Sequence, residues 1–418
     1  MTILESVERE AAAAHAAVPL LTDDAVAAAL ALAAARLSAE HDRVLAANEA
    51  DLAAADLDEG ALDRLRLDTE RLTAIEAQLR ELAVLPPLDR EVATWTLPNG
   101  LDVSELRIPI GVVGANFEAR PNVAVDVAGQ LLKSLNGGVL RTGAAALQTV
   151  TALVDDVLRP ALADAGLPPE TIGLVRSPER DGARALVSLP RVLPLVILRG
   201  SGEATAALAR HAAEHGVRTL AHAEGGGVLY LSASADPAVA EAMIEASLDR
   251  LGVCNRLNLL LVDRAAAPAL LPPIVALLER LGIEVRGTDR AQEHAALAPL
   301  DVRLGHEWAN DAERVATVSV DVVGGPDEAA ELANEETSAL AAAVVAEDAA
   351  VARRFLDRYR GTAAFWQAPT RFTDGFALTG APETGINVDW VPGPRGPVTY
   401  RDLWLRQYRV VGDGTQRR

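Results

Sequence analysis

The sequence predicts an α/β protein with parallel sheets, divided into more than one domain. From residue 110 onward, short apolar runs alternate with helical segments, which is the pattern of βαβ units. A chain of 418 residues also exceeds what one hydrophobic core usually holds. A hairpin signal that precedes the alternating part adds a small separate β element.

The N-terminal part is predicted to be helical. Apolar residues recur at helical spacing through residues 23–85, and Pro86-Pro87 ends the run. Residues 92–108 then alternate in polarity around Pro98-Asn99-Gly100, and Asn-Gly between two such runs indicates a β-hairpin. We therefore expect a helical layer followed by a protruding hairpin.

The remaining elements follow from the alternation. The expected strands are 111–114, 138–141, 192–198, 227–232, 257–262, 315–323 and, last, 403–411. The expected helices are 123–135, 144–165, 203–215 and 236–250. This order predicts parallel pairing with helical crossovers.

Composition excludes several classes of protein. The formal charge of -20 argues against a nucleic-acid-binding surface and against binding to an anionic membrane. The single cysteine rules out an intrachain disulfide and a cysteine-based zinc cluster, and it fits a reducing cytoplasm. Residues 1–10 are acidic and unlike a signal peptide, and no apolar run has the roughly 18 residues of a membrane span. We expect a cytoplasmic protein.

Cys254 lies between a predicted helix and a predicted strand. A cysteine at such a junction can expose its sulfur for nucleophilic attack and its own N–H for an oxyanion, as acyl transfer requires. A lone cysteine is, however, often only a small buried apolar residue. The position by itself leaves both readings open.

Other motifs are weaker. The segment Arg199–Gly202 joins a strand to a helix and could hold a phosphate, or it could be an ordinary tight turn. The pattern His211-x-x-Glu214-His215 matches an inverted zinc-peptidase motif but equally fits an exposed helix. Lys133, the only lysine, could lie in a site or cap a helix.

Several segments, taken in order, resemble the glutamate-5-semialdehyde dehydrogenase (γ-glutamyl phosphate reductase) family of the aldehyde dehydrogenase superfamily. They are Val44–Asn48, Leu97–Gly100, Pro109–Gly114, Phe117–Val123, Leu132–Ser134, Gly252–Asn255, Thr370–Gly375, Arg395–Pro397 and Val411–Gly414. The strings E-A-R-P-N-V and T-R-F-T-D-G are specific to that family. The resemblance covers nearly the whole chain.

The resemblance implies an aldehyde dehydrogenase-like fold with two parallel-sheet α/β domains and a small β oligomerisation flap. Residues 1–92 and 109–227 would form the cofactor-binding domain and 228–395 the catalytic domain. Residues 93–108 and 396–418 would form the flap, whose unpaired edge would join copies into a homo-oligomer. Functional coupling to a glutamate 5-kinase is a further expectation.

The chemistry implied by the resemblance is reduction of γ-glutamyl phosphate by NADPH, with Cys254 as the catalytic nucleophile. The implied substrate-binding residues are Arg120, Asn122, Arg371, Thr373 and Asp374. The implied cofactor-binding residues are Arg141, Gly143, Arg199, Gly200, Gly202, Glu224 and Glu313. No metal is implied.

The chain departs from the family pattern in four places. The pattern L-R-G-G-S-E becomes Leu140–Ala145, and H-x-[DE]-G-x-x-H-V-Y becomes His222–Tyr230 without its second histidine. A Y-G-S-G-H segment is replaced by Glu336–Leu340, and Cys-Asn-Ala-x-Glu becomes Cys254–Asn258, without its Glu. The alternatives to the proline-pathway reductase are therefore a divergent paralogue acting on another acyl phosphate or aldehyde, and a non-catalytic family member.

Overall fold

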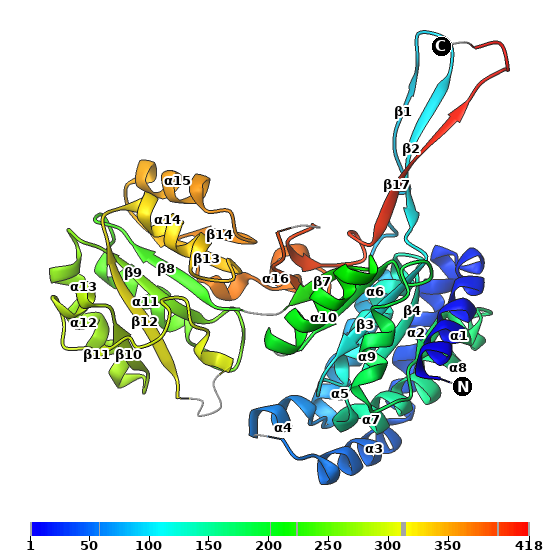
Figure 1. The fold of residues 1–418 in the computed structure, drawn as a ribbon, viewed down its shortest axis with the longest axis horizontal. Helices are drawn as coiled ribbons and strands as arrows, with labels where there is room; N and C mark the ends of the chain where they lie inside the picture. Colours follow the sequence, from blue (N-terminus) through cyan, green and yellow to red (C-terminus); the bar gives the residue numbers. More distant parts are fainter. Residues whose placement is uncertain are drawn as a thin grey trace.

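A computed structural model describes residues 2–57, 59–200, 202–222, 225–310, 315–390 and 393–416. The described chain forms two α/β bodies, each built on a parallel sheet, and a three-stranded flap that projects from them (Figure 1). The predicted α/β class with two parallel sheets and a small β flap is confirmed. In these stretches of the chain, no helix is both long enough and apolar enough to cross a lipid bilayer.

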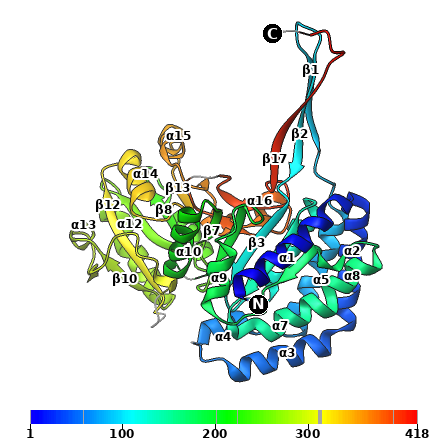
Figure 2. The same ribbon diagram turned by 45° about the vertical axis from the view of Figure 1, so that its right-hand side comes forward.

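Of the N-terminal helices, the last four form a layer over the first sheet and the first packs in a different core (Figure 2). The N-terminal helices are α1 (Ile3–Ala17), α2 (Asp23–Ala39), α3 (His41–Ala54), α4 (Glu59–Leu65) and α5 (Thr69–Val84). Local chemistry sets where they begin: Thr2 and Glu5 form a capping box on α1, and the Asp68 carboxylate accepts the Arg71 amide at the start of α5. Leu30 and Leu72 are fully buried in the core that this layer shares with the sheet.

The first sheet has five parallel strands in the order β5-β4-β3-β6-β7. They are β3 (Val112–Phe117), β4 (Gly137–Thr142), β5 (Ile172–Leu174), β6 (Leu195–Arg199) and β7 (Arg218–His222). The crossovers contain α6 (Asn122–Lys133), α7 (Leu147–Ala152), a π-helical stretch Leu153–Leu158, α8 (Arg159–Asp164), α9 (Arg180–Leu186) and α10 (Gly202–His215). Strand order reverses between β3 and β6, and ligands of open α/β sheets bind where the strands end at such a point.

The second sheet has seven parallel strands in the order β11-β10-β12-β9-β8-β13-β14. They are β8 (Gly227–Leu231), β9 (Leu257–Asp263), β10 (Glu284–Gly287), β11 (Ala298–Pro299), β12 (Thr317–Val323), β13 (Ala341–Val345) and β14 (Ala363–Trp366). Its helices are α11 (Pro237–Ser247), α12 (Ala267–Arg280), α13 (Asp289–Gln292), α14 (Pro326–Glu335) and α15 (Ala349–Arg358). The strands β8, β9, β12 and β13 are buried throughout, as expected of a sheet covered on both faces.

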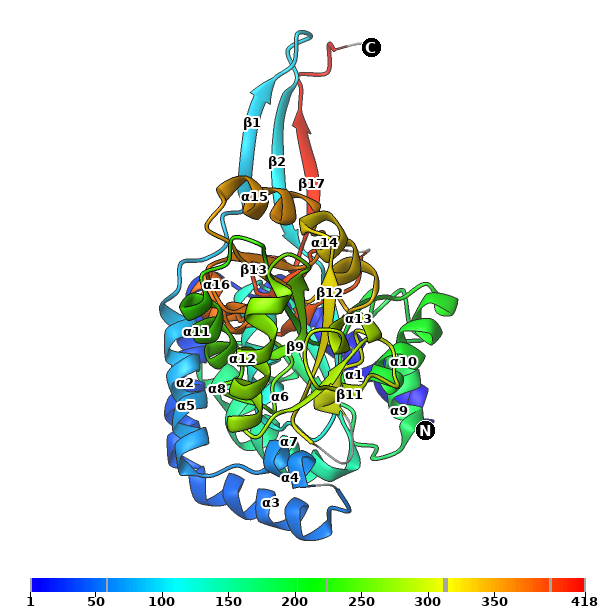
Figure 3. The same ribbon diagram turned by 90° about the vertical axis from the view of Figure 1, so that its left-hand side faces the viewer.

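The flap joins the predicted hairpin to the last strand. Its antiparallel strands are β1 (Glu91–Thr96), β2 (Asp102–Pro109) and β17 (Trp404–Val411), with β2 in the middle. Figure 3 shows the three strands standing clear of both bodies. β1 and β17 are therefore the two edges of this small sheet.

The chain between the second sheet and the flap returns to the first body. It contains α16 (Gly375–Thr379) and the antiparallel pair β15 (Gly385–Asn387) and β16 (Gly396–Val398). Ala381, Val398, Tyr400 and Leu403 are buried in the core of the first body. Residues 370–387 of this returning segment pass the junction between the two bodies.

Candidate active site

The candidate site lies where the carboxyl ends of strands in the first sheet face the amino ends of strands in the second. These two sets of strand ends form the two edges of the site. The carboxyl ends of β3, β4 and β6 contribute the turns that follow Phe117, Thr142 and Arg199. The amino ends of β8 and β9 contribute residues 225–227 and the turn that contains Cys254. One edge thus offers backbone amides and a helix start, and the other a thiol.

Cys254 occupies the turn between α11 and β9 and is partly buried. Its carbonyl accepts the Gly226 amide at 2.6 Å, which ties the turn to the start of β8. Its side chain packs beside a small cluster of Leu340, Ala341 and Ile386. The cysteine therefore sits at a fixed place between the second sheet and the returning segment.

Four charged side chains act on the thiol. Burial, aided by the carboxylates of Glu307 and Glu383, raises the pKa of Cys254 to about 11 against the opposing effect of Arg120 and Arg199. The resting thiol is therefore protonated at neutral pH. A group that takes its proton, or the arrival of a compensating charge, is needed before it can attack.

Arg120 and Arg199, placed in the site by the sequence, do come together. Burial lowers the pKa of Arg120 to about 10, and the nearby guanidinium groups of Arg199 and Arg64 add to this effect. Cations gathered in a partly buried place are a means of holding an anion such as a carboxylate or phosphate. Arg64, on α4, was not among the predicted residues.

Asn122 starts α6 on the same side of the site. Its amide donates to Asp126 at 3.0 Å, and burial raises the pKa of the Asp126 carboxyl to about 6 against the opposing pull of Arg199. The side chain is therefore committed to an acidic neighbour rather than directed at the sulfur by any described contact.

Arg371, Thr373 and Asp374 lie in the segment that Asn255 anchors. The Asn255 amide donates to the carbonyls of Arg371 and Thr373 at 3.1 and 3.0 Å, and the Arg371 guanidinium bonds back to the Asn255 side chain. Arg371 also pairs with Asp249 at 2.6 Å, and Asp374 caps α16 through the Phe376 amide at 3.0 Å. In the structure these residues fasten the returning segment to the cysteine turn.

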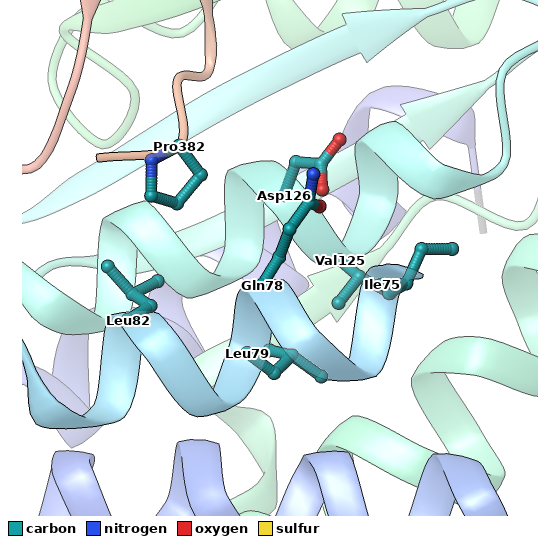
Figure 4. Close-up of a pocket in the computed structure, with 7 residues that line it drawn as sticks. All are labelled: Ile75, Gln78, Leu79, Leu82, Val125, Asp126 and Pro382. Carbon is teal, nitrogen blue, oxygen red and sulfur yellow. The ribbon is translucent and has the colours of Figure 1, made fainter. Parts of the chain in front are cut away.

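Glu383, which the sequence gave no reason to select, is partly buried in this segment. Burial raises the pKa of its carboxyl to about 7, with Arg199 opposing and the acids Asp374 and Asp126 adding to the rise. One of its carboxylate oxygens has no hydrogen-bond partner in the described structure. The neighbouring Pro382 packs over the α5–α6 contact, where Gln78 extends toward Asp126 (Figure 4).

The opposite edge contains the predicted cofactor residues. Arg141 is buried and donates to the Asn116 side chain at 3.1 Å and to the Glu179 carbonyl at 3.0 Å, while its Nε meets no partner within the described stretches of the chain. A Cβ on Gly200 would lie 3.3 Å from the Thr205 hydroxyl and 3.5 Å from the Glu118 carboxylate, so these two side chains pack closely against the glycine backbone. Gly202 begins α10, and Glu118 also lies beside Gly143.

Two predicted cofactor residues, Glu224 and Glu313, lie outside the described residues. Lys133 lies away from the thiol: its ammonium donates to the Leu85 carbonyl at 2.5 Å, just past the last turn of α5. It therefore caps a helix. The ligand atoms of His211, Glu214 and His215 lie within 4.8 Å of one another on α10, and His211 also bonds Ser188 at 3.1 Å.

Sequence reasoning missed Asn255, Glu307, Glu383 and Glu118. Asn255 follows Cys254 directly, and a polar residue buried at the start of a strand could have marked it. Glu118 stands at the end of β3, where an acidic residue can meet a ribose. Glu307 and Glu383 reach the site only through long connections, so no local pattern marks them.

Comparisons with known proteins agree with this architecture. The sequence model of the aldehyde dehydrogenase family matches residues 7–300. The chain is 36% identical over 397 residues to a γ-glutamyl phosphate reductase of Caulobacter sp. (strain K31), covering 93% of each chain. It is 35% identical over 393 residues to one of Gluconobacter oxydans, covering 93% of this chain and 90% of that one.

A solved structure is similar along its whole length. The crystal structure of γ-glutamyl phosphate reductase from Thermotoga maritima superposes with a TM-score of 0.92 and 27% identity, covering 99% of this chain and 100% of that one. Fold and site define a two-body α/β oxidoreductase with a cysteine at the junction. The chain belongs to the aldehyde dehydrogenase family, and its resemblance to the γ-glutamyl phosphate reductases within it is confirmed.

Proposed function

We propose that this enzyme reduces γ-glutamyl phosphate to glutamate 5-semialdehyde with NADPH and releases phosphate, a step of proline biosynthesis. The observation that carries the proposal is the position of Cys254, at the junction of the two bodies and within electrostatic reach of Arg120 and Arg199. The names of the relatives in Caulobacter and Gluconobacter supply the substrate.

The chain's own residues supply the acyl-transfer half of the reaction. The Cys254 sulfur attacks the acyl carbon, the bond to the phosphate oxygen breaks, and a thioester remains. Arg120 and Arg199 offset the charge of the phosphate as it departs. The backbone N–H of Cys254 is the candidate donor to the oxyanion.

The residues at the first sheet's edge fit a nicotinamide dinucleotide. The start of α10 at Gly202 and the acid Glu118, which lies beside Gly200, match what a pyrophosphate and a ribose require. The cofactor would supply the hydride that reduces the thioester. Arg141 is a buried cation near the end of β4, and its Nε has no hydrogen-bond partner among the described residues.

The flap is the proposed oligomer contact. Its edge strands carry exposed apolar side chains, among them Trp95 on β1 and Leu405, Tyr408 and Val410 on β17. An exposed apolar edge invites pairing with another strand, so we expect a homo-oligomer. A reactive acyl phosphate also favours functional coupling to the glutamate 5-kinase that makes it, and the free Cys254 fits a reducing cytoplasm.

A second candidate, a divergent reductase of another acyl phosphate or aldehyde, is favoured by one contact. Asn258 stands where the family pattern has Glu, and its side chain is occupied by the backbone of residues 306 and 308. Turnover of glutamate semialdehyde decides between the two candidates.

The test is the reverse reaction. Purified enzyme receives glutamate semialdehyde, phosphate and NADP, and the reduced cofactor is followed by absorbance, with Cys254→Ala as the matched variant. Phosphate-dependent turnover that disappears in the variant supports the proposal. Folded wild type that is inactive with both NADP and NAD would contradict it and leave the divergent or non-catalytic readings.

A further inference from the structure

Glu307 is an acidic residue that lies beside the cysteine in the described part of the chain. A Cβ built on Gly225 would lie 2.5 Å from the Cys254 Cβ and 2.7 Å from a Glu307 carboxylate oxygen, so both groups border the same small space. Glu307 is also the first of the charged groups that act on the thiol. The absence of a side chain at Gly225 is what lets the two approach each other.

The backbone on both sides of Glu307 is held by one side chain. Asn258, buried on β9, donates to the His306 carbonyl at 2.7 Å and accepts the Trp308 amide at 3.2 Å. Trp308 is itself fixed to β12 through a 2.9 Å bond to the Ser319 hydroxyl. A carboxylate on a segment clamped at both neighbours keeps one direction, which a surface loop would not ensure.

The thiol needs a proton acceptor at this place. Burial and two carboxylates hold its pKa near 11, and the cations Arg120 and Arg199 do not reverse this. Burial lowers the pKa of the nearby Arg256 guanidinium, and the charge of Glu307 opposes that shift. Because proton transfer from the sulfur to a neighbouring carboxylate leaves the net charge of the site unchanged, it avoids placing a second negative charge beside Glu307 and Glu383.

We propose that Glu307 accepts the Cys254 proton, with Asn258 as its positioning residue. As the sulfur–carbon bond forms and the carbon–oxygen bond to phosphate breaks, the thiol proton passes to the Glu307 carboxylate and then to the departing phosphate, which leaves as hydrogen phosphate. The step consumes one thiol and one acyl phosphate and regenerates the carboxylate. It rests on the proposed function for its substrate, although the thiol–carboxylate pair can be tested without one.

The first test is alkylation of the enzyme by iodoacetamide across a range of pH. Cys254 is the only cysteine, so intact mass reports its modification without ambiguity. Transfer of the thiol proton to the ionised Glu307 carboxylate during attack gives wild type an alkylation rate that is nearly independent of pH through the neutral range, because neither group changes its resting protonation state there. In Glu307→Gln the rate should instead fall about tenfold per pH unit as pH decreases, because only free thiolate reacts.

The alternative role of Glu307, a negative charge that merely hinders ionisation, has the opposite consequence. Removing that charge would then lower the pKa of the thiol, and Glu307→Gln would react faster than wild type at every pH. That result overturns the proposal. Glu307→Asp, which keeps a carboxylate, should show a pH-independent alkylation rate (a plateau) that is lower than that of wild type. Glu293→Gln, which removes an exposed acid of the same body, should match wild type.

Turnover supplies a second readout. In the reverse assay Glu307→Gln should lose about 10²-fold in kcat with little change in KM, a typical effect of removing a general base. Asn258→Ala should reduce both the alkylation plateau and kcat, while urea denaturation checks that it folds. A wild type that is inactive in the reverse assay but still shows the pH-independent alkylation rate would refute the proposed substrate and support proton transfer from Cys254 to Glu307. The two proposals can therefore be refuted independently.

Discussion

The two edges that form the site are built in different ways. The proposed cofactor edge is made of turns that are each local in sequence: those after β4 and β6 place Gly143, Gly200 and Gly202 by the geometry of βα units alone. The cysteine edge depends on side chains that join distant segments, as where Asn255 bonds residues 116 and 118 positions away. The difference predicts that single substitutions will damage the second edge more than the first.

The largest effect is expected for Asn255→Ala. It leaves the carbonyls of Arg371 and Thr373 without their donor in a buried place, and an unsatisfied buried group costs about 1–3 kcal/mol. We expect the free energy of unfolding to fall by about 3 kcal/mol and activity to fall by more than about 10²-fold, because the returning segment loses its anchor.

Urea denaturation and steady-state kinetics measure the two effects. Asn334→Ala is the matched control, since its amide also donates to a backbone carbonyl, that of Arg358, at 3.0 Å, but away from the site. Equal losses in the two variants would show that the cysteine edge has no special dependence on its long-range bonds.

Gly225→Ala tests the space that the thiol and Glu307 share. Its methyl group would overlap the Cys254 Cβ at 2.5 Å, and the turn must shift to admit it. A displacement of this size at reacting groups costs about 10²-fold in kcat/KM. Gly252→Ala, two residues before the cysteine, has open space around the new methyl and should keep wild-type activity.

The returning segment should also make stability depend on pH. The pKa of Glu383 rises from its ordinary 4.5 to about 7, so the folded protein holds this proton more tightly than the unfolded chain does. Wild-type stability is therefore unaffected below pH 4.5 and declines as pH rises through 7. Glu383→Gln removes that decline and should be more stable than wild type by about 3 kcal/mol at pH 8, but not at pH 4.5.

Denaturant unfolding at both pH values measures this difference. The exposed Glu335→Gln should track wild type throughout. If Glu383→Gln were less stable than wild type at pH 8, the carboxylate would be a stabilising partner in the fold, contrary to its burial without a bond to one of its oxygens.

The contrast between the edges also explains what the sequence could predict. Alternating strands and helices, the Asn-Gly turn and the family segments were enough for the α/β class and the flap. They also selected Cys254, Arg120 and Arg199, whose roles stay predictions, but they gave no sign that the two arginines lie near each other. Lys133 remained open because a helix cap and a site residue look alike in one dimension. Glu307 and Glu383 could not be found, since each lies more than 50 residues from Cys254 in sequence and depends on tertiary packing for its position.

The smallest effect is expected at the cofactor edge. Gly200→Ala would place a methyl 3.3 Å from the Thr205 hydroxyl, a contact that a shift of a few tenths of an ångström relieves. We expect a cost of about 1 kcal/mol, seen as about a fivefold higher KM for the dinucleotide with kcat unchanged. Adding Thr205→Ala removes the hydroxyl and should restore KM. A loss as large as that of Gly225→Ala, not rescued by the second change, would show that both edges depend equally on close packing.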